Sequence, residues 1–476
     1  MNKSFAYLPP EKRKKIVLIT DDIRTHSGVG TVGREIIMNT SQHFNWVNIG
    51  GAVKHPDKGK RFDLSEDTNK RTGITDASVI VYPCDGYGDA NFLRQIIQVE
   101  KPDAIFLITD PRYFTWLFSI ENEIRRKIPI IYLNIWDDYP APLYNKAYYE
   151  SCDLLMGISK QTVNINNIVL GEKAKGKILK YVPHGLNHNI YKPLPKDDEK
   201  LIAFKQQAFG DKELDFILFF NSRNIRRKQI PDTMLAFRYF LDKLTPEQRQ
   251  RCAFILHTDP ISDHGTDLPA VKELILDKDN ILFSSNKVDD ETLNLLYNVA
   301  DAQILLTSNE GWGLSLTEAI LAGTPIIANV TGGMQDQMRF VDEEGKWFVP
   351  SSDIPSNNTG RYKECGEWAF PVFPSNRSIQ GSPATPYIWD DRCRPEDAAE
   401  QIMNLYNMTR EERKTLGLKG REWAIGEEAG FTAEMQGKRV IEAIDELFET
   451  WTPRQKFEFI NTNKVERKVN THKLLY

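Results

Sequence analysis

The sequence predicts an α/β protein of two doubly wound domains, each built on a mainly parallel sheet. Short apolar runs alternate with helix-like stretches, and the alternation starts again after a proline-bearing segment at 191–200. The length of 476 residues fits this division, because single cores stop growing near about 250–300 residues. We therefore expect an N-terminal domain over 1–195 and a C-terminal domain over 196–451, with 452–476 completing the first domain.

The expected strands are short apolar runs, as is typical of strands buried on both faces of a sheet. In the first domain they are 15–20, 46–50, 77–83, 104–109, 128–136, 154–159 and 177–183. In the second domain they are 215–220, 253–257, 280–284, 303–307 and 325–330. Helical periodicity returns over 395–406, 410–425 and 432–451.

An irregular stretch separates the last expected strand from these final helices. Residues 334–392 are rich in Pro, Ser, Asn and Gly and include Trp347, Phe348, Trp368 and Phe370. Long loops without regular structure are uncommon and often functional. We expect a long insert there that is functional or faces a substrate.

Composition limits the class of protein. Hydrophobic residues make up 41% and charged residues 27%, which is ordinary for a folded globular chain. The net charge of −5 gives no overall attraction to nucleic acid or membrane. Five scattered cysteines suggest neither a disulfide framework nor a zinc site, and no run approaches the roughly 18 apolar residues of a spanning helix. We expect a cytoplasmic protein without integral membrane association, metal or cofactor.

The strongest motif follows the expected strand at 303–307. Gly311 and Gly313 allow a tight turn into a helix that begins near Leu314, whose first N–H groups then point outward. Such a helix start binds diphosphate. Glu310 and Glu318, eight residues apart, lie on the same side and can accept hydrogen bonds from sugar hydroxyls.

This stretch resembles the signature of family-four retaining glycosyltransferases of the GT-B fold, in which two Rossmann-like domains face one another across a cleft. The signature is a Glu-x7-Glu spacing around Gly-Trp-Gly-Leu, followed by Glu-Ala, Gly-x-Pro and the pair 332–333. The resemblance implies that Glu310 faces the donor sugar and that Glu318 holds the ribose hydroxyls. It also implies that the amides of Gly313, Leu314 and Ser315 meet the diphosphate.

A basic segment gives a second match. Arg223 follows the expected strand at 215–220, and Lys228 comes five residues later, in the places of the family's diphosphate-binding Arg and Lys. Preorganised cations stabilise the charge that develops on a leaving phosphate. We predict Arg223, Lys228 and Glu310 as the catalytic residues, and we interpret Arg226 and Arg227 as a solvated basic turn.

A glycine-rich loop in the first domain gives a third match. Gly28, Val29 and Gly30 lie between a strand and a helix, as in the family loop that approaches the donor phosphate from the opposite domain. Together with Gly33 they also fit a dinucleotide fingerprint. A dehydrogenase is disfavoured, because Gly28 comes late after the strand and 48–53 offers no acidic residue for a ribose.

Further candidates surround the expected cleft. His184 lies in a Pro-His-Gly-Leu-Asn crossover that resembles the family's, and Val288 is a candidate for flanking the base. After the strand at 128–136, relatives commonly carry His-Asp, whereas this chain has Trp136 at the His position. Asp137 and Asp138 are then candidates, with His184, for the acceptor side.

The resemblance implies a retaining hexosyl- or pentosyltransferase that takes its sugar from a nucleotide-sugar, by default a UDP-sugar. A saccharide, a lipid-linked glycan, a small molecule and a hydroxylated DNA base all stay open as acceptors. A GT-B epimerase and a non-catalytic nucleotide-sugar binding module are the alternatives.

Overall fold

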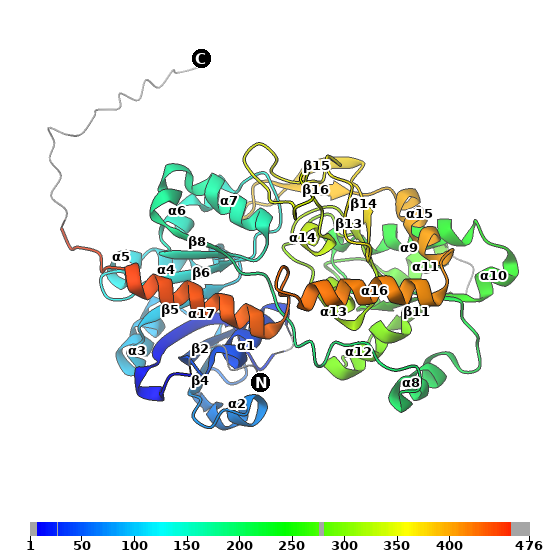
Figure 1. Cartoon of the computed structure of the whole chain (residues 1–476). Coiled ribbons are helices and arrows are strands. Elements are labelled where there is room, and N and C mark those ends of the chain that lie inside the picture. Colours follow the sequence, from blue (N-terminus) through cyan, green and yellow to red (C-terminus); the bar gives the residue numbers. More distant parts are fainter. Residues whose placement is uncertain (1–6, 26, 276–279, 458–476) are drawn as a thin grey trace, which may run out of the picture.

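Two separate, mainly parallel sheets form the centres of two Rossmann-like domains (Figure 1). The structure is a computed structural model that describes residues 7–25, 27–275 and 280–457. The first sheet has the order β3-β4-β2-β1-β5-β6-β7-β8, and the second has the order β11-β10-β9-β12-β13-β14. Both domains carry helices between successive strands, as the sequence predicts.

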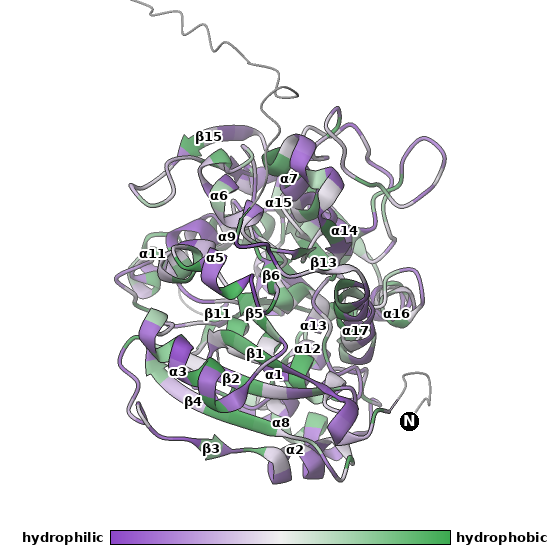
Figure 2. Cartoon of the chain, turned by 90° about the vertical axis from the view of Figure 1, so that its left-hand side faces the viewer, coloured by the Kyte–Doolittle hydropathy of each residue, from purple (hydrophilic) through white to green (hydrophobic). Residues whose placement is uncertain are grey.

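The first domain is built on strands that match the predicted apolar runs and on one short edge strand, β3, that pairs antiparallel with β4. Its strands are β1 (Lys14–Asp21), β2 (Phe44–Ala52), β3 (Phe62–Asp63), β4 (Val79–Asp85), β5 (Ala104–Ile108), β6 (Ile130–Asn134), β7 (Leu154–Gly157) and β8 (Ile178–Tyr181). Its helices are α1 (Gly28–Thr40), α2 (Ser65–Thr72), α3 (Ala90–Glu100), α4 (Thr115–Phe118), α5 (Glu121–Ile124), α6 (Lys146–Glu150) and α7 (Lys160–Leu170). Figure 2 shows the strands of this sheet as largely hydrophobic and α2 and α3 as carrying hydrophilic residues.

The second domain begins with α8 (Glu199–Phe209) after the linker. Its strands are β9 (Phe216–Asn221), β10 (Cys252–His257), β11 (Ile281–Ser284), β12 (Ala302–Leu305), β13 (Ile326–Asn329) and β14 (Ala369–Val372). Its further helices are α9 (Ile230–Leu241), α10 (Pro246–Gln250), α11 (Leu268–Ile275), α12 (Asp290–Val299), α13 (Leu314–Ala322), α14 (Met334–Met338), α15 (Pro395–Tyr406) and α16 (Arg410–Ile425). The Thr-Arg-Glu-Glu start of α16 forms a capping box, in which Thr409 and Glu412 satisfy each other's backbone N–H groups.

The stretch 334–392 is more regular than the sequence predicts. It contains β14, the sixth strand of the second sheet, and an antiparallel hairpin of β15 (Asn376–Gln380) and β16 (Ile388–Arg392). The sequence hides β14 because it is short and contains Pro371, a residue that sheets tolerate at an edge. Since β14 is the edge strand of its sheet, the missing N–H costs no hydrogen bond to an inner neighbour.

The chain returns to the first domain earlier than predicted. Helix α17 (Ala433–Thr450) packs against α1, β7 and β8, so the return begins at Ala433 and not at 452. Figure 1 shows α17 lying along the first domain as a continuation of the line of α16. Of the segment 452–476 that was expected to complete this domain, 458–476 lie outside the described residues.

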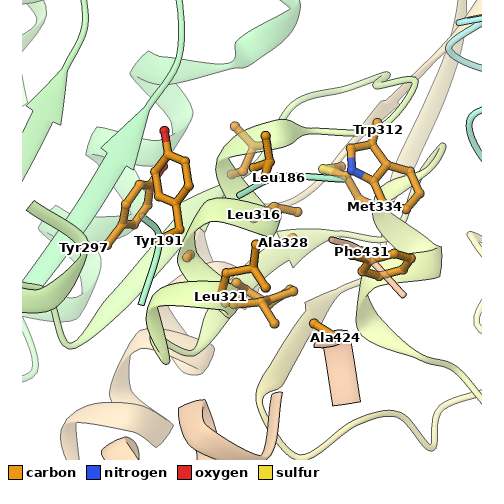
Figure 3. Packing of buried hydrophobic residues seen from close by; sticks show 14 of the residues in the cluster. Leu186, Tyr191, Tyr297, Trp312, Leu316, Leu321, Ala328, Met334, Ala424 and Phe431 are labelled. Atoms are coloured by element: carbon orange, nitrogen blue, oxygen red, sulfur yellow. The ribbon is translucent and has the colours of Figure 1, made fainter. Parts of the chain in front are cut away.

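The two crossings between the domains run side by side. Leu186 donates its N–H to the Phe431 carbonyl (3.2 Å) and accepts from the Ala433 N–H (2.9 Å). A side chain at Gly185 would collide with the Thr432 carbonyl oxygen at 2.1 Å, so only glycine fits at this point of the crossover. Figure 3 shows Leu186 and Phe431 among buried side chains of the second domain.

Candidate functional site

Glycines in and around the loop between β12 and α13 lie so close to neighbouring backbone that a side chain would not fit. A Cβ at Gly332 would lie 1.8 Å from the Glu310 carbonyl oxygen, and one at Gly333 would lie 2.0 Å from that of Gly311. A Cβ at Gly311 would lie 2.6 Å from the Ile135 carbonyl oxygen of the first domain. Gly332 and Gly333 therefore let the segment after β13 pack directly against the backbone of this loop. Gly311 likewise lets the loop pack against the backbone that follows β6.

Helix α13 starts without a side-chain cap. Its N-cap residue is Gly313, with φ +87°, and no side chain accepts a hydrogen bond from the first turn. Among the described residues, no backbone acceptor is recorded for the N–H groups of Gly313, Leu314 or Ser315. Unsatisfied N–H groups and the positive end of the helix dipole make this helix start suited to an anion.

The glycine-rich loop of the first domain faces this helix start. A Cβ at Gly28, the first residue of α1, would lie 3.8 Å from Cδ1 of Leu314, the first residue of α13. Gly30 is packed tightly, because its Cβ would lie 2.9 Å from the oxygens of both Ser27 and Thr25. The structure thus brings the starts of the two helices together from opposite domains, as the resemblance implies.

Two cations and a carboxylate lie beside the glycine-rich turn. Glu310 accepts hydrogen bonds from Lys228 and, at 3.0 Å, from Nη1 of Arg227. The Arg227 guanidinium also donates to the Asn309 carbonyl at 2.6 Å. Although burial alone would raise the pKa of Glu310, the two cations lower it to about 2, while burial lowers the pKa of Lys228.

Arg227 is the residue that sequence reasoning missed. The structure brings Arg227 to Glu310, whereas Arg223 is exposed and has no recorded side-chain partner among the described residues. A short 3-10 turn over Arg226–Lys228 explains the difference, because it turns Arg227 and Lys228 toward the same carboxylate. The interpretation of Arg227 as a solvated turn residue is wrong. Only a prediction of this turn would have revealed it from sequence.

Asp137 and Asp138 lie in different surroundings although they are adjacent. Burial raises the pKa of Asp137, while Arg227 and Lys228 act in the opposite direction. Asp137 also accepts a hydrogen bond from the Gly311 backbone. It therefore belongs to the same cluster of charges as Glu310.

Asp138 does not face an open acceptor side, and this prediction needs correction. Its side chain is fully buried and accepts hydrogen bonds from the Tyr139 N–H (2.8 Å), Gln161 (2.9 Å) and Thr331 (3.1 Å). Burial and the nearby Asp391 carboxylate raise its pKa well above the ordinary value. Asp138 instead joins the two domains, because Thr331 and Asp391 belong to the second one.

His184 is buried near the same cluster and carries no charge at neutral pH. Burial lowers its pKa to about 4, against the attraction of Glu310. Its ring meets Trp312 edge to face at 6.2 Å, and its Nδ1 has no recorded hydrogen-bond partner. His184 thus lies buried at the crossover between the domains, where a neutral imidazole can accept or donate one hydrogen bond.

Glu318 lies one helical turn into α13 and is held by two donors. Tyr297 donates its O–H to the carboxylate at 2.5 Å, and Asn221 donates an amide N–H at 3.1 Å. Burial raises the pKa of Glu318 to about 7. Val288 is half-buried in the loop between β11 and α12, at the same edge of the sheet.

Sequence reasoning also missed a polar group at the end of β1. Asp22 is fully buried and receives hydrogen bonds from Arg24 (2.7 Å) and His55 (3.0 Å), and Tyr87 donates to Asp21 at 2.6 Å. The signal was present, because one carboxylate ends the buried parallel strand β1 and the next directly follows it, so both lie at the ligand-facing edge. Among the described residues, no group of three or more His, Cys, Asp or Glu is arranged to hold a metal ion.

The second domain matches a known family. Residues 202–355 match the model of the family Glycosyl transferases group 1. An uncharacterized glycosyltransferase of Methanocaldococcus jannaschii is 26% identical over 124 residues. That alignment spans 26% of this chain and 30% of the relative.

Solved structures extend the likeness to both domains. Sucrose-phosphate synthase of Thermosynechococcus elongatus is 16% identical with a TM-score of 0.64, and covers 92% of this chain and 100% of its own. A glycosyltransferase of Rickettsia africae is 15% identical with a TM-score of 0.62, with 92% and 100% covered. HepE of Anabaena, solved with UDP and glucose, is 15% identical with a TM-score of 0.62, with 91% and 100% covered. These likenesses confirm the predicted GT-B fold.

In the described part of the chain, no helix is long and apolar enough to cross a membrane.

Proposed function

Because a glycosyl transferases group 1 domain lies within a GT-B fold here, we propose that this protein moves a sugar from a nucleotide-sugar to an acceptor hydroxyl, with retention of anomeric configuration. One observation carries the proposal. The uncapped start of α13 faces the glycine-rich start of α1 across the domain junction, next to the Lys228, Arg227 and Glu310 cluster. This arrangement supplies backbone N–H donors and positive charge, which would stabilise the negative charge of a leaving nucleoside diphosphate.

The donor proposed first is a UDP-hexose. HepE was solved with UDP and with UDP-glucose, which makes this donor the first to test here. The diphosphate would lie at the N–H groups of Gly313, Leu314 and Ser315. Glu318, held by Tyr297 and Asn221, would accept hydrogen bonds from the ribose hydroxyls. Val288 would flank the base.

The proposed chemistry is electrostatic. Cleavage of the bond between sugar and phosphate leaves negative charge on the diphosphate, and fixed donors stabilise that charge without reorganising. Lys228 and Arg227 are already oriented by Glu310, so their positions do not depend on the donor. Losing one such donor typically costs about 10²–10³ in kcat. Arg223, exposed at the end of β9, is free to reach a bound diphosphate.

The acceptor would enter from the first domain, whose strand ends carry Asp21, Asp22 and Tyr87. As the acceptor hydroxyl attacks the anomeric carbon, its proton passes to an oxygen of the departing phosphate, so no protein nucleophile is required. Asp137 and the neutral His184 lie close enough to Glu310 to influence this step. A saccharide, a lipid-linked glycan, a small molecule and a hydroxylated DNA base are the acceptors to compare.

The test is a transfer assay with a panel of nucleotide-sugars and these acceptor classes, read by mass spectrometry, with the anomeric configuration of the product read by NMR. We expect one donor to add its sugar mass to one acceptor, with retained configuration. The Lys228→Ala variant should lose this activity, and Arg226→Ala, an exposed neighbour without a recorded side-chain partner, should keep it. Isomerised donor without transfer would instead support an epimerase, and binding without any turnover would support a binding module.

A further inference from the structure

A cavity lies apart from the proposed donor site, where the 376–392 hairpin meets the first domain. Its volume is about 420 Å³, within the range of about 300–1,000 Å³ that is typical of small-molecule sites. The residues that matter for its chemistry are Tyr139, Asp353, Ser356, Arg361, Arg377 and Trp389. None of the proposed donor-binding residues lines it. Figure 1 shows the hairpin of β15 and β16 between the two domains, at the top of the molecule.

The hairpin is fixed in place by both domains, which makes the cavity a formed site. The Trp389 N–H donates to the Tyr139 carbonyl of the first domain at 2.7 Å. Tyr144 of the same domain donates its O–H to the Tyr387 carbonyl at 3.1 Å. On the other side, the Asp391 N–H donates to the Ser308 carbonyl of the second domain at 2.9 Å. The cavity walls are therefore held by contacts that do not need a ligand.

One wall is aromatic and cationic. The Arg377 guanidinium lies over the Trp389 ring, with Cζ 5.5 Å from the ring centroid. Its Nε donates to the fully buried Asp391 at 2.7 Å, which fixes the plane of the guanidinium. The two terminal nitrogens of Arg377 have no recorded partner among the described residues, and the side chain keeps 34% of its exposure. A fixed guanidinium with free terminal N–H groups suits an oxyanion.

Arg361 and Asp353, which also line the cavity, supply a second cation and a carboxylate that can bind hydroxyls. Arg361 is exposed, and its ion pair with Glu343 (3.2 Å) is itself solvent-exposed and therefore weak. Asp353 is exposed and has no recorded side-chain partner in the described part of the chain. A cavity lined by one carboxylate and two guanidinium groups is less suited to a simple anion than to a ligand that has both an anionic group and hydroxyls.

We propose that this cavity binds a small anionic sugar, a phosphorylated hexose or a uronic acid. The sugar ring packs against Trp389, its anionic group is bound by Arg377 and Arg361, and its hydroxyls donate to Asp353. The proposal goes beyond the proposed function, because the site needs neither a nucleotide-sugar nor sugar transfer to bind its ligand.

The test is isothermal titration calorimetry of the full chain with glucose 6-phosphate, glucuronate, glucose and inorganic phosphate, each with and without saturating UDP. We expect at least one of the two anionic sugars to bind about tenfold or more tightly than both glucose and phosphate, and UDP should not compete. Which of the two binds identifies the anionic group. Arg361→Ala and Trp389→Leu should each weaken this binding about tenfold.

The matched control is Arg394→Ala, which removes an exposed arginine beyond the hairpin that does not line the cavity, and should leave binding unchanged. Lys228→Ala should also leave it unchanged, so a failed donor site and a failed anionic-sugar site give different results. Arg361 is exposed, so its loss should not unfold the protein, whereas Arg377 holds a buried carboxylate and is a poor first variant. Displacement by UDP, binding of neither anionic sugar more tightly than glucose and phosphate, or equal affinity in all variants would each overturn the proposal.

Discussion

The starts of α1 and α13 lie against one another, yet the chain completes them differently. At α1, Ser27 accepts a hydrogen bond from the Gly30 N–H at 2.9 Å, so part of the helix end is satisfied by the protein itself. At α13, Gly313 has a positive φ and no side chain caps the helix. Two glycine-rich motifs that look alike in sequence thus form helix starts that differ in capping. The uncapped start of α13, the open helix start, is the one that we propose to bind the diphosphate, and the capped start of α1 is the closed one.

The largest effect should come from the cation beside the open helix start. We expect Lys228→Ala to lower kcat for sugar transfer by about 10²–10³, because it removes a preorganised charge from the leaving diphosphate. Steady-state kinetics measures this, with Arg226→Ala as the control. A loss smaller than tenfold would mean that the charge of the leaving group is stabilised elsewhere.

A substitution at Gly313 tests the uncapped start of α13 through its backbone. Gly313→Ala places a Cβ on a residue with φ +87°, which costs about 1–2 kcal/mol of folding free energy, and it disturbs the N–H groups that are proposed to bind the diphosphate. We expect a lower Tm and a UDP affinity that is weaker by about tenfold. Equal UDP affinity in a folded variant would contradict the role of this helix start.

Loss of Arg223 and loss of Arg227 should change different kinetic constants. Arg227 is held by Glu310 before any donor binds, so Arg227→Ala should lower kcat by about tenfold or more. Arg223 is exposed, so Arg223→Ala should raise KM for the donor and leave kcat nearly unchanged. The reverse pattern would show that Arg227 is only structural.

Glu318 predicts a pH dependence near neutrality. Burial raises its pKa to about 7, and in the proposed role only the ionised carboxylate would accept hydrogen bonds from both ribose hydroxyls. KM for the donor should therefore fall about tenfold between pH 6 and pH 8, and Glu318→Gln should flatten the profile. A raised carboxyl pKa means that the folded state binds more protons between about pH 4.5 and 7 than the unfolded state, so the contribution of Glu318 to stability decreases as pH rises through that window.

The smallest effect should come from the closed helix start. Ser27→Ala removes the cap of α1 and should cost about 1 kcal/mol in the free energy of unfolding, measured by urea denaturation. Ser27→Ala should weaken UDP binding less than Gly313→Ala does. A larger loss of UDP affinity from Ser27→Ala would reverse the contrast between the two helix starts.

The sequence predicts much of the fold because buried parallel strands are continuous apolar runs, and those runs coincide with β1, β2 and β4 to β13. It misses β14 because Pro371 disguises an edge strand, and it places the return to the first domain late because the contact of α17 with α1 is non-local.

In the candidate site, the sequence predicts Glu310, Lys228 and the glycine turn from local spacing, and the structure brings Lys228 and Glu310 into contact next to that turn. Sequence reasoning misjudges Arg227 and Asp138, because a 3-10 turn and a contact between domains decide where those side chains lie.

A crystal structure of the protein with UDP would test the central claim most directly. The account predicts the diphosphate within hydrogen-bonding distance of the N–H groups of Leu314 and Ser315 and of the Lys228 ammonium, with the ribose hydroxyls at Glu318. A diphosphate bound away from the start of α13 would contradict it. A structure at saturating UDP with no nucleotide between the starts of α1 and α13 would contradict it as well.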